Sequence, residues 1–268
     1  MPTVLLLGYS LSDWSLIGYK PSFVGLSNFI SLFTEDPQLW RALYVNVFFS
    51  VVAVSAEFGL GFGLALLMDR EFPGRGLFRS LLILPMVMTP VVVGLTWRVL
   101  FSPTFGMINY FTSLLGIAPR AWVADAATAL GAVIVVDIWQ WTPFMFLMLT
   151  AGLQSLPQEP FEAAHVDGAT KWQRFRYLVL PMLSPVIVIA LLLRFIESFK
   201  TFDIIYMLTR GGPGTATQNL NIYTYYVGFD WLRPGYASAM AVVMLVLVIA
   251  ITKVFIKVTS LDIGGGEG

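Results

Sequence analysis

Long apolar runs make up most of this chain, and they restrict its possible folds more than any other feature. A helix needs about 20 apolar residues to cross the hydrocarbon core of a bilayer. Five runs meet that length, roughly Ala42–Met68, Leu77–Phe101, Ala127–Leu153, Ser184–Leu208 and Tyr236–Val258. The run Pro2–Leu11 is too short to span, lacks the features of a signal peptide, and predicts the outer half of a first helix. We therefore predict an all-α integral membrane protein: a helical bundle of five complete transmembrane helices plus a partial first one.

The composition agrees with a membrane location and excludes several functions. Hydrophobic residues make up 57% of the chain and charged residues 12%, against about 25% charged in typical soluble domains. The net charge is zero and the basic residues form no dense run, which argues against a nucleic-acid partner. The chain has no Cys and one His, so it offers no thiolate or histidine cluster for a metal and no catalytic cysteine. We expect no metal site, no bound cofactor and no enzymatic activity.

The connections between the apolar runs differ in their content of Lys and Arg, which favour the cytoplasmic side of membrane proteins. One set of connections holds eight such residues: Arg70, Arg75, Arg79, Lys171, Arg174, Arg176, Lys253 and Lys257. The opposite set holds five: Lys20, Arg41, Arg120, Arg210 and Arg233. We therefore predict that residues 69–76, residues 154–183 and the C-terminus face the cytoplasm.

The longest of the predicted cytoplasmic connections, residues 154–183, has the pattern of two short helices joined by a bend. Pro160 suits the first turn of a helix, where its missing N–H has no helical partner to lose. Gly168 can adopt a positive φ and end this helix, and Thr170 can cap a second helix that runs to about Val179. Pro181 is expected to interrupt the chain before the next span. From these residues alone, an ordinary amphipathic loop at the membrane surface is an equally good interpretation.

The order of residues in this connection is typical of one family. Glu162-Ala163-Ala164, then Asp167-Gly168-Ala169, then Leu180-Pro181 resemble the EAA loop of ABC-importer permeases. The resemblance implies that the loop forms a coupling helix that docks in a cleft of a separate ATPase. Glu162 would pair with a basic residue of the ATPase, Ala163 and Ala164 would allow close packing, and Gly168 would make the turn. No P-loop sequence occurs in the chain, so ATP and Mg would be bound by the partner ATPase.

The resemblance extends over nearly the whole chain, from about Phe23 to Lys257, as a single transmembrane domain. Gly74–Pro85, Trp97 with Phe105-Gly106 and Asn109, and Leu208–Thr215 are similar to the carbohydrate-uptake branch of these permeases. This similarity implies an inner-membrane subunit that moves a sugar, polyol or glycerol phosphate inward by alternating access. It further implies a second homologous permease, a cytoplasmic ATPase dimer and an extracytoplasmic solute-binding protein as partners.

Four ionisable residues, spaced by three, occur at the end of the fourth apolar run: Arg194, Glu197, Lys200 and Asp203. An ionisable group within a span costs about 2.5–3.5 kcal/mol on insertion scales, so such groups face a polar cavity or one another. The spacing predicts a stripe on one helix face. The stripe could be a self-neutralising chain of ion pairs or a lining of the transport path. The resemblance favours Glu197, Lys200 and Asp203 near that path.

A second group of candidates for the path lies in the third complete span. Sugars are bound by planar hydrogen-bonding groups and by aromatic faces, which Asp137, Trp139 and Gln140 could supply. The alternative is that Trp139 is an interfacial anchor and that the polar groups serve the structure. Asn46 is a weaker candidate of the same kind.

Three other classes of function remain as alternatives. The charged stripe could relay protons in an ion-gradient-driven secondary transporter, and an ABC permease could carry a non-sugar solute. An integral-membrane enzyme would need a convergent catalytic group that the sequence does not offer. Gly59, Gly61 and Gly63 lie inside an apolar run without a preceding strand, so they predict close helix packing rather than a nucleotide site.

Overall fold

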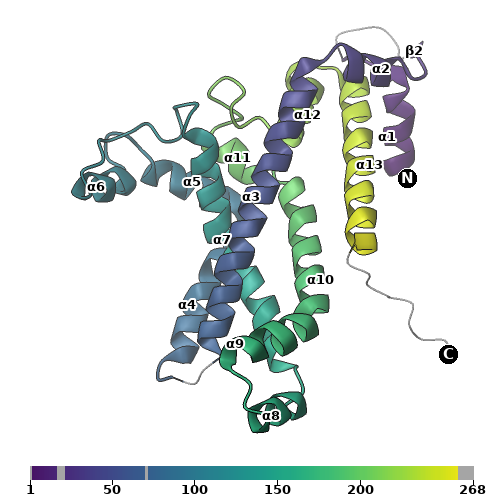
Figure 1. Cartoon of the computed structure of the whole chain (residues 1–268). Coiled ribbons are helices and arrows are strands. Elements are labelled where there is room, and N and C mark those ends of the chain that lie inside the picture. Colours follow the sequence, from purple (N-terminus) through teal and green to yellow (C-terminus); the bar gives the residue numbers. More distant parts are fainter. Residues whose placement is uncertain (1, 17–21, 70–71, 259–268) are drawn as a thin grey trace, which may run out of the picture.

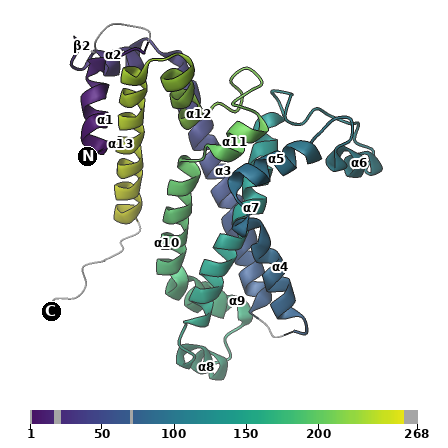
Figure 2. The same ribbon diagram turned by 180° about the vertical axis from the view of Figure 1, so that it is seen from behind.

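The computed structural model describes residues 2–16, 22–69 and 72–258. Three long helices form its centre: α3 (Pro37–Met68), α7 (Ala129–Gln154) and α10 (Leu180–Phe199). Helices α3 and α7 run side by side, and α10 packs against both (Figure 1). Helices α1 (Pro2–Ser10) and α13 (Pro234–Val258) pack together on one side of this centre, with α6 (Met107–Leu114) on the other (Figure 2). Among the described residues, four helices are long and apolar enough to span a membrane, and a fifth span results if one bent pair counts as a single crossing.

That bent pair corrects the predicted helix Leu77–Phe101. The structure has two helices there, α4 (Arg75–Val87) and α5 (Pro90–Leu100), with 98° between them. The physical reason is the sequence Thr89-Pro90, because a proline disfavours helical geometry in the residue before it. Thr89 has φ −67° and ψ 139°, which is extended backbone, so the helix ends before it and a new one starts at Pro90.

The structure also corrects the expectation that Pro181 interrupts the chain. Helix α8 (Glu159–Val166) ends before the bend at Gly168. Helix α9 (Lys171–Arg174), a π-helical turn η1 (Phe175–Val179) and α10 then follow one another without a gap. Residues 171–199 are one helical run of 29 residues. Pro181 lies in the first turn of α10, directly after the wider π turn, so the rod continues through the proline.

The predicted span Ser184–Leu208 is wrong at its outer end. Helix α10 stops at Phe199, and α11 (Asp203–Leu208) starts after a three-residue break. Side-chain amides satisfy the carbonyl groups at this break: Asn46 donates to the Phe199 carbonyl at 3.2 Å, and Asn219 donates to the Thr201 carbonyl at 2.6 Å. Asp203 therefore does not continue the helical stripe that its spacing from Arg194 predicted.

Short elements that the apolar pattern did not predict join the long helices. They are β1 (Ser12–Asp13) paired antiparallel with β2 (Ser22–Phe23), α2 (Ser27–Thr34), α6, α11, α12 (Leu220–Tyr225) and the π turn η2 (Tyr226–Asp230). Asp36 ties several of them together. Its carboxylate caps α3 at the Gln38 N–H (3.0 Å) and accepts hydrogen bonds from the hydroxyls of Tyr223 (2.6 Å) and Tyr236 (3.0 Å). Burial and this carboxylate raise the pKa of Tyr223, so its hydroxyl stays a donor.

Close packing of α3 on α7 depends on one glycine of the predicted three. A Cβ at Gly61 would lie 2.5 Å from the Met145 Cβ, whereas a Cβ at Gly59 or Gly63 would have no atom within 4 Å. Gly61 therefore lets the two backbones approach, as expected for small residues between membrane helices. The prediction holds for Gly61 and is wrong for Gly59 and Gly63 within the described residues.

Candidate functional site

A buried ion cluster connects the three central helices. Arg194 on α10 donates from Nε to Glu57 Oε2 at 2.7 Å and from Nη2 to Glu57 Oε1 at 2.9 Å, and it also donates to Asp137 Oδ2. Glu57 is on α3 and Asp137 is on α7, and all three side chains are at most 1% exposed. Two carboxylates thus share one guanidinium in fork geometry, which is the strong form of ion pairing. The Arg194 Cζ also lies 5.0 Å from the ring centre of Trp141.

The ion cluster gives Arg194 different partners from those that its spacing suggested. Arg194 pairs across helices and makes no ion pair with Glu197, its neighbour in the expected chain. Asp137, a candidate for the transport path, is fully buried against the guanidinium and is not among the residues that line the neighbouring polar cavity. Glu57 was not predicted. Its signal was present, however, because it is the one acidic or basic residue in the run Ala42–Met68 and must have a partner if it is buried there.

A small polar cavity of about 140 Å³ adjoins the ion cluster where α10 ends. Its lining residues come from α5, α7, α10, α11 and the break between the last two: Pro90, Trp141, Arg194, Glu197, Lys200, Thr201, Phe202, Asp203 and Ile204. Lys200 Nζ donates to Glu197 Oε1 at 2.8 Å, with both side chains about half exposed. Three predicted path residues, Glu197, Lys200 and Asp203, thus meet at one cavity although Asp203 lies on a separate helix.

The other predicted path residues lie outside this polar cavity. The Gln140 Nε2 donates to the Met88 carbonyl at 3.0 Å, and Asn46 donates to the Phe199 carbonyl. Both amides therefore satisfy backbone carbonyls freed where a helix bends or stops. Trp139 is partly exposed and packs edge-on against Trp97, with ring centres 5.5 Å apart. Trp141, two residues further on, is the tryptophan that lines the cavity.

The connection between α7 and α10 has the local geometry that its sequence predicted. Gly168 has φ +74° and ends α8, and the Ala169 N–H donates to the Ala164 carbonyl at 2.9 Å. Thr170 caps α9 through a reciprocal capping box with Gln173: the Gln173 N–H donates to Thr170 Oγ1 at 3.3 Å, and the Thr170 N–H donates to Gln173 Oε1 at 2.8 Å. A glycine end followed by a box cap fixes the angle between the two helices.

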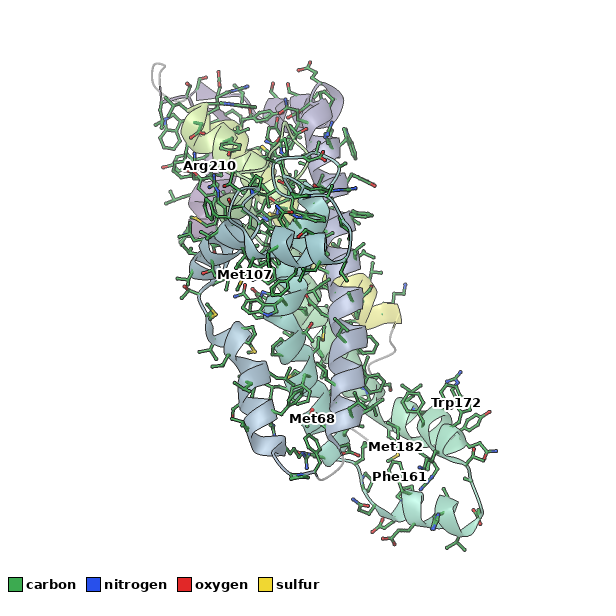
Figure 3. All side chains as sticks on the ribbon, turned by 90° about the vertical axis from the view of Figure 1, so that its left-hand side faces the viewer. Met68, Met107, Phe161, Trp172, Met182 and Arg210 are labelled. Carbon is green, nitrogen blue, oxygen red and sulfur yellow. The ribbon has the colours of Figure 1, made fainter. Side chains whose placement is uncertain are left out.

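This connection also exposes large apolar side chains. Val166 is 86% exposed, Trp172 69% and Tyr177 72%. A surface groove of about 380 Å³ runs between α8 and the α9–η1 rod, lined by Ala164, Asp167, Gly168, Ala169, Gln173, Arg174, Tyr177 and Leu178. Glu162 and Ala163 are exposed on α8. Figure 3 shows Phe161, Trp172 and Met182 at this end with Met68, far from Arg210. Met68, which precedes the connection at 69–76, thus lies at the same end of the bundle as the connection at 154–183.

The fold and the polar cluster within it define a class of protein: a multi-pass helical membrane protein with ionisable groups gathered at its centre. The comparisons assign the family. Residues 58–260 match the family described as binding-protein-dependent transport system inner membrane component. The chain belongs to this family, and it is a permease subunit of an ABC importer in the inner membrane rather than an enzyme. Family membership places it in an assembly with ATPase subunits and a periplasmic binding protein.

Individual relatives agree with the family. A probable ABC transporter permease protein of Sinorhizobium fredii is 44% identical, over 94% of this chain and 82% of the relative. The trehalose/maltose transport system permease protein of Thermococcus litoralis is 39% identical, over 92% and 82%. Among solved structures, a bacterial ABC transporter that imports the acidic polysaccharide alginate has a similar fold, with a TM-score of 0.83 at 22% identity, covering 98% of this chain and 94% of that chain.

Proposed function

We propose that residues 154–183 are the cytoplasmic segment through which the ATPase drives this permease, with contact made by Glu162, Ala163, Ala164, Asp167, Gly168 and Ala169. The observation that supports this most strongly is the exposed apolar surface of Val166, Trp172 and Tyr177. A surface that faces only water rarely exposes three large apolar side chains so fully. We therefore expect a protein or lipid surface to cover them. The groove beside Gly168 offers a concave surface lined by both apolar and polar side chains.

The rigid link from this segment to the bundle supports the same proposal. Residues 171–199 form one helical run, so a force applied at α9 reaches Arg194 along a continuous rod. Arg194 in turn binds Glu57 and Asp137 on α3 and α7. Movement of the docked segment is therefore transmitted to all three central helices, which is what alternating access requires.

A charge reversal tests the coupling role. In the assembled importer, Glu162→Lys should abolish ATPase stimulation by the binding protein while membrane insertion and subunit assembly persist. Glu159→Lys is the matched control, because it reverses a charge in the same first turn of α8 and has the same effect on the helix dipole. Normal stimulated ATP turnover in Glu162→Lys would remove Glu162 from the mechanism.

We propose further that the polar cavity is the contribution of this chain to the path of a sugar or sugar-like solute. Glu197, Lys200, Thr201 and Asp203 supply hydrogen-bonding groups, and Trp141 supplies an aromatic face. Sugars need this combination. The trehalose/maltose relative supports a carbohydrate rather than a non-sugar solute. The remaining candidates would affect the path indirectly. Polar contacts fix the positions of helices around the path in the case of Asp137, Gln140 and Asn46. Trp139 would contribute through its ring contact with Trp97.

The remainder of the transport machinery is supplied by other chains in this proposal. A second homologous permease completes the central path, a solute-binding protein delivers the solute from outside, and a cytoplasmic ATPase dimer binds ATP and Mg. The family assignment favours this ATP-driven importer over an ion-gradient-driven secondary transporter.

The absence of native cysteine allows a direct test of the path. A single Asp203→Cys substitution should react with a water-soluble thiol reagent in the intact importer, and bound solute should slow that reaction. Leu193→Cys is the control, because Leu193 is exposed on an apolar stretch of α10 outside the cavity. If solute and nucleotide leave the labelling rate at position 203 unchanged, the cavity is not on the path.

A further inference from the structure

The two cations of the polar cavity, Arg194 and Lys200, are both neutralised within this chain. Arg194 is bound by two carboxylates, those of Glu57 and Asp137, at zero to 1% side-chain exposure. Lys200 is bound by Glu197 at 2.8 Å. Arg194 uses three of its five N–H donors on these two carboxylates, and Lys200 uses one of its three ammonium N–H donors on Glu197. The lining therefore offers no uncompensated positive charge from the described part of the chain.

The acidic groups of the same region are in excess. Glu57 and Asp137 are two carboxyl groups that share the one guanidinium of Arg194, so the ion cluster has no net positive charge. The Glu197–Lys200 pair sums to zero. Asp203 lines the cavity, is exposed, and makes no ion pair among the residues that the structure describes. The unpaired charge at the cavity is therefore the negative charge of Asp203.

From this charge balance, which rests on the proposed path, we infer that the permease selects uncharged polyhydroxylated solutes and excludes phosphorylated, sulfonated or carboxylated sugars. Sugar hydroxyls can donate hydrogen bonds to the free carboxylate of Asp203. They can also donate to the carboxylate of Glu197, which is about half exposed. An anionic group would meet carboxylates instead. At an effective dielectric of about 20, a like charge about 6–12 Å away weakens binding by roughly 10- to 100-fold.

The pairing of Arg194 and Lys200 with carboxylates limits how strongly an anionic solute could be attracted to either cation. Arg194 cannot turn toward a solute without leaving two buried carboxylates unpaired, which costs more than a new ion pair returns. Lys200 is about half exposed and keeps N–H donors that Glu197 does not use, but its positive charge is already compensated by Glu197. Exclusion of anions is therefore built into the pairing, and Glu197 is the residue that controls the availability of Lys200.

Two experiments test the inference. The first measures ATP-dependent uptake by the complete importer, with its binding protein, in proteoliposomes supplied with trehalose, maltose, glycerol 3-phosphate or trehalose 6-phosphate. Uptake of a neutral sugar is expected. Uptake of an anionic solute as fast as or faster than the neutral ones would overturn the inference while leaving the proposed function intact. No ATP-dependent uptake of any of these classes would count against the proposed function itself.

The second experiment assigns the selectivity to this cavity. Binding of labelled trehalose and trehalose 6-phosphate is measured on the complete importer in nanodiscs without the binding protein. Glu197→Gln keeps the side-chain size but frees Lys200, and it should raise affinity for the phosphate sugar relative to trehalose by roughly tenfold. Asp230→Asn, an exposed carboxylate outside the cavity, is the matched control. An unchanged affinity ratio in Glu197→Gln, or equal affinities in the wild type, would overturn the inference.

Discussion

Replacement of Arg194 by methionine would test how strongly the ion cluster holds the bundle together. Methionine matches the length of the arginine stem but leaves Glu57 and Asp137 buried without a cation. Breaking a fully buried ion pair by removing one partner costs about 3–5 kcal/mol. Arg194 makes two hydrogen bonds to Glu57, at 2.7 and 2.9 Å, and a further one to Asp137, so the upper part of that range applies. At about 2–4 °C per kcal/mol, a loss of about 4–5 kcal/mol should lower the unfolding temperature by roughly 8–20 °C.

The assay is thermal unfolding of the purified importer in nanodiscs, followed by the loss of monodisperse protein on size-exclusion chromatography. Arg98→Met is the matched control, since Arg98 is exposed and makes one long hydrogen bond of 3.4 Å to the Met207 carbonyl. A variant that replaces Arg194 by Met, Glu57 by Gln and Asp137 by Asn removes all three charges and should recover most of the loss. If Arg194→Met unfolds within about 2 °C of the wild type, the carboxylates are not left unpaired and the reasoning fails.

Three further predictions concern packing, the helix break and the cap. Gly61→Val should lower the yield of the importer and reduce its stability by about 1–3 kcal/mol, because the valine side chain would overlap α7. Gly59→Val should be near neutral in the same thermal assay. Gln140→Leu should cost about 1–3 kcal/mol and loosen the α4–α5 bend, because the Met88 carbonyl loses its donor; faster protease cleavage at the bend would report this, and an unchanged cleavage rate would contradict it. Thr170→Ala should cost about 1 kcal/mol of local stability and raise amide exchange in α9, whereas Thr170→Ser should restore protection; equal exchange in both would refute the capping role.

The predicted elements that survived unchanged are those set by local chemistry. The bend between α8 and α9 depends on a positive φ at Gly168 and on a box cap at Thr170, and both need only neighbouring residues. The long apolar runs likewise needed only length and hydropathy to predict helices. Local rules also gave one wrong prediction, because Pro181 does not break the helix. A π turn precedes it, and no propensity rule predicts where such a turn forms.

The candidate site divides in the same way. Glu197, Lys200 and Asp203 were selected for their cost within a span, and they meet at one cavity even though the helix that was expected to hold them stops at Phe199. Their spacing nevertheless predicted the wrong partner for Arg194. The helix period brings together residues on one helix, whereas the guanidinium is satisfied by α3 and α7, 137 and 57 positions away in the chain.

The sequence by itself determined that the chain is a helical membrane protein and that residues 154–183 form a helix, a glycine bend and a second helix, because apolar length, φ preference and capping act over a few residues. Only the tertiary structure decided which polar groups are paired. Whether a buried charge is a ligand site or a structural tie depends on the atoms that reach it from other helices. Glu57, Asp137 and Arg194 are neutralised by one another, and Asp203 is left open, only because α3, α7, α10 and α11 pack as they do.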